Sequence, residues 1–260
     1  MTLTPDQLER YARHIMLKEV GGPGQARLKN AEIALIGAGG LGGPAALYLA
    51  AAGVGRIRLI DDDEVSLSNL QRQILFDTSQ IGTAKVDAGA TQLAKLNPDI
   101  EIIPVSERLT TDNAADLLDG ATLVLDGSDT FSTRFDVNQA CFDLGSILVS
   151  GAIGRWAGQV SVFKAGLSKS RPEDERAPCY RCFVSEAPEH AETCEEVGVI
   201  GPLAGFVAAR MALETVKEIT GAGTSLSGRV WIFDGLTGDA RTIALKRDPD
   251  CATCGRNTKN

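Results

Sequence analysis

The chain is poor in the residues that most often carry acid–base chemistry, and it lacks segments that would place it in a membrane. Its 260 residues include 2 histidines, 3 methionines and 2 tryptophans. The polar N-terminus has no signal-peptide apolar run. No stretch reaches the roughly 18 apolar residues of a membrane span. We therefore expect a cytoplasmic protein with reduced cysteines and no membrane partner.

Positive charge is also scarce. The formal net charge is -8, and no basic run exceeds two residues. A nucleic-acid-binding protein normally carries a basic stripe, so we expect no nucleic-acid partner. The 43% hydrophobic and 23% charged residues are ordinary for a globular protein, and the length suits one large α/β domain or two small ones.

Apolar runs typical of strands alternate with helical patterns along most of the chain. We expect strands at 32–36, 56–60, 101–105, 121–125, 146–150, 159–163, 229–233 and 241–245, and helices at 5–20, 42–52, 83–96, 130–144 and 202–220. Thr4 and Gln7 form a capping box before the first helix, and a turn at 21–24 follows that helix. This order predicts an α/β fold with a Rossmann-like, doubly wound, mostly parallel sheet and late antiparallel strands.

A glycine-rich motif follows the first strand. Gly37, Gly39 and Gly42 fit G-x-G-x-x-G between a strand and a helix, and Asp61 ends the next strand. Such glycines let phosphates approach the backbone N–H groups at a helix N-terminus, and the acid binds ribose hydroxyls. The motif predicts a nucleotide site; the alternative is a tight turn without a ligand. A dehydrogenase is disfavoured, because neither His14 nor His190 follows a later strand.

A more specific pattern comes next. The run 61–73, DDDEVSLSNLQRQ, together with 37–42, GAGGLG, resembles the ubiquitin-activating-enzyme superfamily, and within it the bacterial MoeB/ThiF group. The resemblance extends from Arg10–Ile15 to the last CxxC pair. It implies ATP-dependent adenylation of the C-terminal glycine carboxylate of a ubiquitin-like sulfur carrier that ends in Gly-Gly. The carrier is expected to be of the molybdopterin-synthase type; a thiamine-pathway carrier and a non-catalytic, nucleotide-dependent binding module are the alternatives.

The same resemblance implies roles for individual residues. Asp61 matches the ribose-binding acid, Lys85 the phosphate-binding lysine and Asp129 the acid that supports Mg²⁺. Arg13 matches an arginine that reaches the ATP of the partner subunit, which implies a homodimer. The implied catalytic residues are Arg13, Arg72, Lys85 and Asp129. The implied nucleotide-binding residues are Gly37, Gly39, Gly40, Gly42, Asp61, Asp63, Asn69, Arg72, Gln73, Lys85 and Asp129.

Elementary electrostatics agrees with these roles. A carboxylate that attacks an α-phosphorus approaches a triphosphate, and like charges about 4 Å apart repel by roughly 4 kcal/mol at an effective dielectric constant of about 20. Arg72, Lys85, Arg13 and a metal ion would offset this repulsion. No general base is needed, because the carboxylate is already ionised. The plainer alternatives are that these cations are surface charges and that Asp129 caps the next helix.

Four of the six cysteines form two CxxC pairs. Cys179 and Cys182 are separated from Cys251 and Cys254 by 68 residues, and four thiolates can hold Zn²⁺ tetrahedrally. We expect a structural zinc site that ties the chain end to the polar segment 164–199. A redox pair is the alternative, but neither pair opens a helix after a strand.

The other two cysteines differ from each other in their surroundings. Cys141 fits the core face of a helix. Cys194 is a candidate reactive thiol, as in some members of the family, although Glu192, Glu195 and Glu196 should raise its pKa.

The second half of the chain is expected to bind the partner. Within a single domain, 1–260, we distinguish a helical arm (1–29), a nucleotide-binding core (30–163) and a part for partner binding, zinc and the chain end (164–260). We expect segment 185–196 to clamp the carrier tail. Gly151, Gly154 and Gly158 are expected to help form its channel; the alternative is that they are simply turn glycines. Because no sulfurtransferase domain follows the last CxxC, sulfur is expected from a separate sulfurtransferase.

Overall fold

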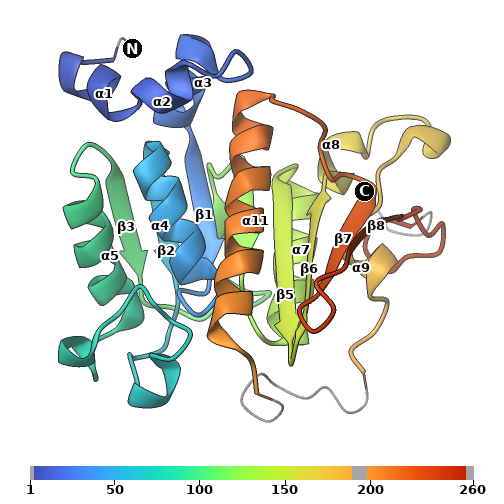
Figure 1. Cartoon of the computed structure of the whole chain (residues 1–260). Helices are drawn as coiled ribbons and strands as arrows, with labels where there is room; N and C mark the ends of the chain where they lie inside the picture. Colours follow the sequence, from blue (N-terminus) through green and yellow to red (C-terminus); the bar gives the residue numbers. More distant parts are fainter. Residues whose placement is uncertain (1–2, 189–197, 256–260) are drawn as a thin grey trace.

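The computed structural model describes residues 3–188 and 198–255, and within them eight strands form one sheet in the order β3-β2-β1-β4-β5-β6-β7-β8 (Figure 1). Strands β1 to β5 are mutually parallel, whereas β6, β7 and β8 are added antiparallel. The predicted mostly parallel sheet with late antiparallel strands is confirmed. The strands are β1 (Glu32–Ile36), β2 (Arg56–Ile60), β3 (Glu101–Val105), β4 (Leu123–Asp126), β5 (Ile147–Gly154), β6 (Ala157–Phe163), β7 (Arg229–Asp234) and β8 (Ala240–Ala244).

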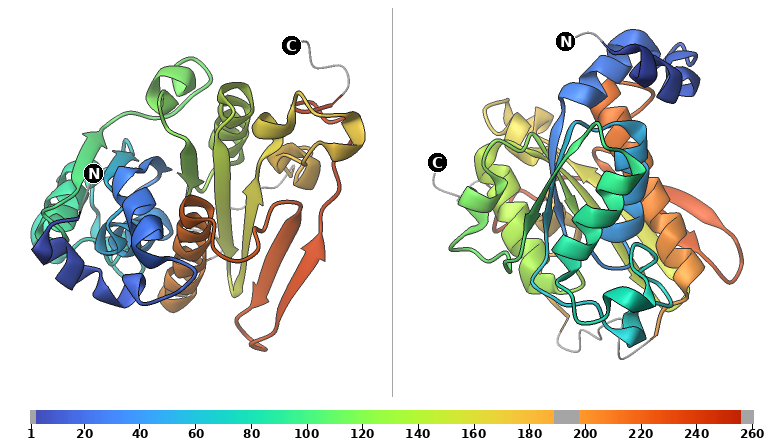
Figure 2. Two further views of the ribbon diagram at one scale, coloured as in Figure 1. Left: turned by 90° about the horizontal axis from the view of Figure 1, so that it is seen from above. Right: turned by 90° about the vertical axis from the view of Figure 1, so that its left-hand side faces the viewer.

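Helices cover both faces of the sheet. Helices α4 (Gly42–Ala52), α5 (Lys85–Leu96) and α11 (Gly201–Thr220) lie on one face, and α6 (Ala114–Leu118) and α7 (Phe131–Leu144) lie on the other (Figure 2). Alternate residues of β1 therefore enter different cores: Ile33 packs with α4 and α11, and Ala34 with α6 and α7. Burial on both faces explains why these strands read as continuous apolar runs.

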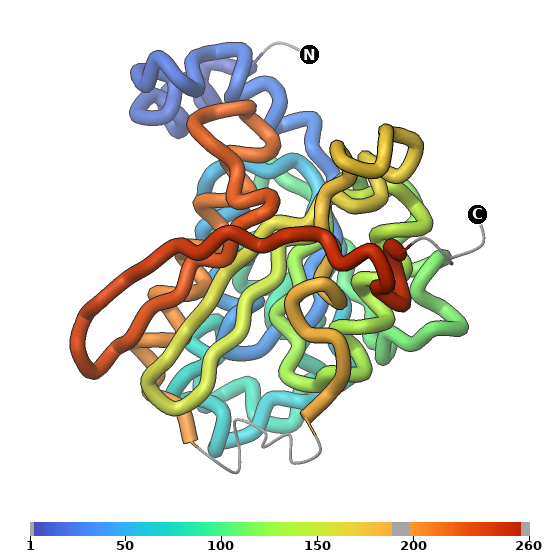
Figure 3. The backbone as a smooth tube through the Cα atoms, turned by 90° about the vertical axis from the view of Figure 1, so that its right-hand side faces the viewer, coloured from blue at the N-terminus to red at the C-terminus, as the bar shows by residue number. Residues whose placement is uncertain are grey.

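Short helices connect the main elements. The 3-10 helices are η1 (Leu67–Asn69), η2 (Thr78–Gln80) and η3 (Glu173–Glu175), and two one-turn α-helices, α8 (Ala165–Ser168) and α9 (Tyr180–Phe183), lie in the predicted polar segment. The chain end comes back beside this segment, as the tube in Figure 3 shows.

The N-terminal arm differs in detail from the prediction. The capping box of Thr4 and Gln7 is present, but three helices replace one: α1 (Pro5–Arg10), α2 (Ala12–Ile15) and α3 (Gly21–Asn30). The first break follows from Tyr11, which leaves helical geometry and buries its ring, with its hydroxyl accepting a hydrogen bond from Asn97. Residues 21–24, expected to form a turn, instead begin α3, where Gly21 takes a positive φ of 56°. Pro23 is tolerated near the start of this helix because the first N–H groups of a helix have no partner within it.

Two glycines expected to line a channel make room for α11. A Cβ at Gly151 of β5 would lie 2.3 Å from Sδ of Met211, and one at Gly158 of β6 would lie 2.3 Å from Cγ2 of Val207. The close approach of α11 therefore requires glycine at both positions, and their part in a channel stays a prediction. Gly154, at the end of β5, has no neighbour within 4 Å of such a Cβ.

None of the helices in residues 3–188 and 198–255 combines the length and apolar character needed to cross a bilayer.

Candidate nucleotide-binding site

A pocket of about 250 Å³ opens at the carboxyl ends of the parallel strands. It lies where the strand order reverses between β1 and β4, which is the position where open α/β sheets bind ligands. Its walls come from the loops after β1, β2, β3 and β4 and from the end of β5. The predicted residues that line it are Gly37, Gly39, Gly40, Asp61, Asp63, Arg72, Gln73, Lys85 and Asp129.

The three motif glycines have different local surroundings. Gly37 has a φ of 84°, and a Cβ there would lie 3.2 Å from the Gly127 carbonyl oxygen. At Gly42, the first residue of α4, a Cβ would lie 1.7 Å from the Gly37 carbonyl oxygen, so only glycine allows the helix to pack this closely. Gly39 and Gly40 would make only ordinary contacts of 3.5 Å through a Cβ. Their small size is therefore not required by the protein's own packing, which leaves backbone accessible to a phosphate.

Asp61 joins the glycine loop to the end of β2. Its Oδ2 accepts the Ala38 N–H at 2.7 Å, and its Oδ1 accepts the Asp63 N–H at 2.8 Å. Burial raises the pKa of this carboxyl, with the positive charge of Lys85 and the two N–H donors acting in the opposite direction. Each carboxylate oxygen keeps a lone pair, so the group can still accept hydrogen bonds from ribose hydroxyls.

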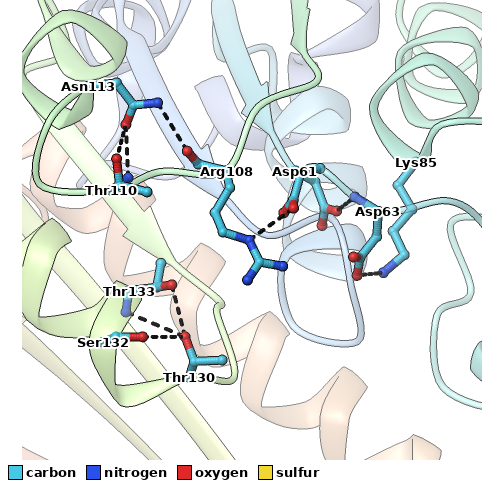
Figure 4. A network of polar contacts seen from close by, with 10 residues as sticks. Asp61, Asp63, Lys85, Arg108, Thr110, Asn113, Thr130, Ser132 and Thr133 are labelled. Carbon is cyan, nitrogen blue, oxygen red and sulfur yellow. Dashed lines mark hydrogen bonds and ion pairs between the residues drawn. The ribbon is translucent and has the colours of Figure 1, made fainter.

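A buried lysine forms one wall of the pocket. The side chain of Lys85, in the first turn of α5, is 5% exposed, and its Nζ lies 2.8 Å from Oδ2 of Asp63 (Figure 4). Asp63 is held in turn, because its carbonyl accepts the Lys85 N–H at 2.9 Å. The ion pair and this backbone hydrogen bond therefore fix the position of the Lys85 side chain at the pocket wall.

The loop after β2 presents the other polar groups. Arg72 is half-buried and donates from Nη1 to the Ser68 carbonyl at 3.2 Å. The Oε1 atom of Gln73 is buried without a hydrogen-bond partner among the described residues. Asn69 does not line the pocket. Its carbonyl accepts the N–H groups of Arg72 and Gln73, so it shapes the turn that presents them.

Asp129 follows β4 and faces the pocket. It is exposed and makes no hydrogen bond or ion pair with any described residue. The cap of α7 is Thr130, whose hydroxyl accepts the Thr133 N–H, so Asp129 is not a capping residue. A free carboxylate at this place can ligate a divalent cation. The carboxylates of 61–63 also lie within 4.8 Å of one another, but two of them are paired with Lys85 and Arg108.

Arg13 is not brought into the pocket of its own chain. It lies exposed on α2, with Nη1 3.8 Å from Sδ of Met16. Its neighbour Tyr11 packs against residues that follow the C-terminal ends of α4 and α5, whereas the pocket lies at their N-terminal ends. His14 is also distant, with Nδ1 3.2 Å from Oε1 of Gln25. No histidine lines the pocket within the part of the chain that the structure describes, and His190 lies outside that part.

Two arginines of the pocket were missed in the sequence. Arg108 follows β3, and its Nε lies 2.9 Å from Oδ2 of Asp62, on the opposite side of the acidic run from Lys85 (Figure 4). A hydrogen bond and charge from Asp62 raise its pKa. Arg134, on the first turns of α7, is buried and donates from Nη2 to the Ser128 carbonyl at 2.6 Å. The signal was available: charged residues after every parallel strand belong to the same edge of the sheet.

The four CxxC cysteines come together at one place. Their sulfurs all lie within 4.8 Å of one another, with 3.6 Å between Cys179 and Cys251 and 3.4 Å between Cys182 and Cys254. A tetrahedral Zn²⁺ with Zn–S distances of about 2.3 Å requires sulfurs about 3.8 Å apart, so the cluster fits this ion. Neither pair opens a helix after a strand: α9, which follows Cys179, comes after η3.

Of the two remaining cysteines, one lies within the described residues. Cys141 is buried in α7, as predicted, and burial raises its pKa far above that of a reactive thiol. Cys194 lies outside the described residues, as does most of the segment 185–196 predicted to clamp the carrier tail.

Comparison with known proteins adds independent information. Residues 11–253 match the sequence model of the ThiF family. The chain is 40% identical over 254 residues to the molybdopterin-synthase adenylyltransferase of Salmonella typhimurium, covering 98% of this chain and 99% of the relative. It is also 40% identical over 257 residues to the sulfur carrier protein adenylyltransferase of Thermus thermophilus, covering 98% and 93%.

Among solved structures, the fold is similar to that of Escherichia coli MccB crystallised with ATP. The TM-score is 0.80 at 21% identity, over 94% of this chain and 74% of that chain. At this identity the likeness supports the fold, a mostly parallel sheet with late antiparallel strands.

Proposed function

The chain belongs to the ThiF family, and from this premise we propose that it is an adenylyltransferase: it uses ATP to adenylate the C-terminal carboxylate of a ubiquitin-like sulfur carrier and releases pyrophosphate. The observation that carries the proposal is one pocket in which Lys85, Arg72 and Asp129 surround a glycine loop at a helix N-terminus. The names of two relatives, each 40% identical over nearly the whole chain, support it.

The proposed mechanism assigns binding and charge stabilisation to the chain. Backbone N–H groups of 37–42 receive phosphates, Asp61 receives the ribose, and Lys85 and Arg72 stabilise charge on the triphosphate as pyrophosphate leaves. Asp129 would hold Mg²⁺, and the bound ion would offset the negative charge of the phosphate oxygens. Gln73 lines the same pocket beside the glycine loop. The carrier's carboxylate attacks the α-phosphorus unaided, because it is ionised at neutral pH.

The proposed carrier is of the molybdopterin-synthase type. A relative of that name covers the chain from end to end, and the relative named for sulfur carriers in general is equally similar. A thiamine-pathway carrier is the second candidate, favoured by the thiol of Cys194. A regulatory module that binds nucleotide without turnover is the third.

Carrier-dependent exchange of pyrophosphate into ATP tests these alternatives. We expect exchange with the molybdopterin-type carrier and little with the thiamine-type carrier assayed side by side. Asp129→Asn and Arg72→Ala should abolish exchange with unchanged thermal unfolding, and Arg56→Ala, at the opposite edge of the sheet, should retain it. Absence of exchange with any Gly-Gly-ended carrier would leave only the binding module.

We also propose a homodimer in which Arg13 completes the partner's site. Support comes from its exposed position, away from the pocket of its own chain. Complementation tests it: Arg13→Ala and Asp129→Ala homodimers, each inactive, should recover activity after subunit exchange, because mixed dimers contain one intact site. The double variant Arg13→Ala/Asp129→Ala mixed with wild type is the control, since its mixed dimers contain no intact site. No recovery would place Arg13 outside the site.

We further propose that the cysteine cluster binds zinc and that the protein is cytoplasmic. The four-thiolate cluster would hold Zn²⁺ as a closed structural site, because all four positions are filled by protein. Among the described residues every cysteine is free, which suits a cytoplasmic location. Elemental analysis of the purified protein should give one zinc per chain.

The folded body of the carrier would bind an exposed aromatic surface next to the turn between β5 and β6. Phe206 of α11 is 49% exposed and packs against Trp231 and Phe233, whose rings stack on β7. Trp156 in the turn is 45% exposed, and its carbonyl accepts the Gly235 N–H. Such aromatic side chains are enriched at protein interfaces. Phe206→Ala should raise the KM for the carrier and leave the KM for ATP unchanged.

A further inference from the structure

One side chain of α7 holds both CxxC pairs. Asn138, 2% exposed, accepts the Tyr180 N–H at 2.8 Å through Oδ1, and its Nδ2 donates to the Thr253 hydroxyl at 3.3 Å. Tyr180 lies inside the first CxxC and Thr253 inside the second. The Thr253 hydroxyl in turn donates to Oε1 of Gln139 at 3.1 Å. The cysteine cluster is therefore fixed to α7 as well as to the chain end.

One helical turn earlier, the same face of α7 holds the pocket wall. Arg134 lies four residues before Asn138, a spacing that places side chains next to each other on a helix. Its Nη2 donates to the Ser128 carbonyl at 2.6 Å, in the loop that carries Asp129. The N–H of the same Ser128 donates to Oδ1 of Asp126, at the end of β4, at 3.0 Å. The loop is thus held from two sides, by β4 through Asp126 and by α7 through Arg134.

Tyr180 fills the space between these two attachments. Its ring is 2% exposed and lies 5.9 Å from the rings of both Phe135 on α7 and Phe163 on β6. Its hydroxyl has no hydrogen-bond partner of ordinary geometry among the described residues. Phe135 directly follows Arg134 near the start of α7. A movement of the first CxxC would therefore be transmitted through the packed rings to the part of α7 that carries Arg134.

We propose that the four-cysteine cluster positions the 127–130 wall of the nucleotide pocket through α7, with Asn138 and Tyr180 as positioning residues. The inference rests on the proposed function, since it assigns the pocket to ATP. It goes beyond a cluster that merely ties down the chain end. Loosening the cluster from α7 should lower affinity for ATP, even when the cysteines and their metal are intact.

The test compares two buried asparagines in the full-length protein. Asn138→Ala removes the bridge between the cluster and α7. Asn97→Ala removes an amide that is 0% exposed and donates to Tyr11 and to the Ala50 carbonyl, at the far end of the sheet. Both should lower the thermal midpoint. Only Asn138→Ala should weaken Mg·ATP binding, by about 2- to 30-fold in titration calorimetry, the range of measured couplings along packed networks.

The outcomes separate the two proposals. A wild-type protein that binds no ATP overturns both. If the wild type binds ATP, equal affinity in Asn138→Ala, or equal losses in both variants, overturns the positioning role alone. Thr253→Val deletes the two hydrogen bonds that join the second CxxC to Asn138 and Gln139, without touching a thiol. It serves if Asn138→Ala fails to fold. Its zinc content should equal that of the wild type, and its ATP affinity should fall; an unchanged affinity overturns the inference.

Discussion

Glycines of the phosphate loop can be divided by experiment into those that the fold requires and those that a ligand requires. Gly42→Ala would place a methyl 1.7 Å from the Gly37 carbonyl oxygen, about half an ordinary contact distance. Either α4 or the loop must move. An added methyl in a packed core costs about 1–3 kcal/mol, and about 2–4 °C of the melting temperature is lost per kcal/mol in a chain of this size. We expect the midpoint to fall by roughly 2–12 °C.

Gly39→Ala should behave in the opposite way. Its methyl would have its nearest neighbour, Nε2 of Gln73, at 3.5 Å, and the backbone is not in the left-handed region. Stability should change by less than about 1 kcal/mol, and a small gain is expected from a less flexible unfolded chain. The methyl would stand on the surface to which phosphates bind, so ATP affinity should fall by about tenfold or more, or roughly 1.4 kcal/mol.

Both variants are measured by thermal unfolding and by titration with Mg·ATP. Gly205→Ala in α11, where a Cβ would have no neighbour within 4 Å, is the control and should be slightly more stable with unchanged affinity. Wild-type affinity in Gly39→Ala would refute phosphate binding at this loop. An unchanged midpoint in Gly42→Ala would refute the close contact between the loop and α4.

Three further predictions concern the cysteine cluster and two other residues of the nucleotide pocket. Cys182→Ser should release zinc and lower the thermal midpoint; unchanged metal content by elemental analysis would contradict the four-thiolate site. Burial raises the pKa of Asp61, so between the usual pKa of about 3.9 and the raised value the folded protein binds more protons than the unfolded chain, and stability is lost as pH rises through that window. The stability of Asp61→Asn relative to wild type, measured by urea unfolding, should therefore grow from pH 4 to pH 7. A constant difference would count against this prediction. Arg108→Ala should weaken ATP binding with little change in stability, since the ion pair of Arg108 with Asp62 is exposed. An equal loss of ATP affinity in Arg56→Ala would contradict a role of Arg108 in the pocket.

Much of the sheet was predictable because each strand has a local signal. Three strands, β1 to β3, begin and end at the predicted residues, since short apolar runs bounded by turn residues mark strands, even in β3, which lies at the sheet edge and is only partly buried. The N-terminal break at Tyr11 had no local signal. It depends on a buried contact with Asn97, 86 residues away.

The site was predictable to the extent that its residues belong to contiguous motifs. Lys85 and Asp129 lie within short sequence motifs that identify them, and the structure brings both to the pocket wall. Arg108 and Arg134 lie outside such motifs, and only the strand order shows that they face the same pocket. The bridge at Asn138 was also invisible, since it joins segments 42 and 115 residues distant along the chain.

The reversal of strand direction after β5 divides the sheet into two regions, and only one of them lines the pocket. Among the described residues, those that line the pocket come from the parallel half or the end of β5, and none comes from β6, β7 or β8. Sequence change in β6, β7 or β8 therefore leaves the residues that line the pocket unaltered. The outer surface of the antiparallel half and the lining of the pocket can vary independently of each other.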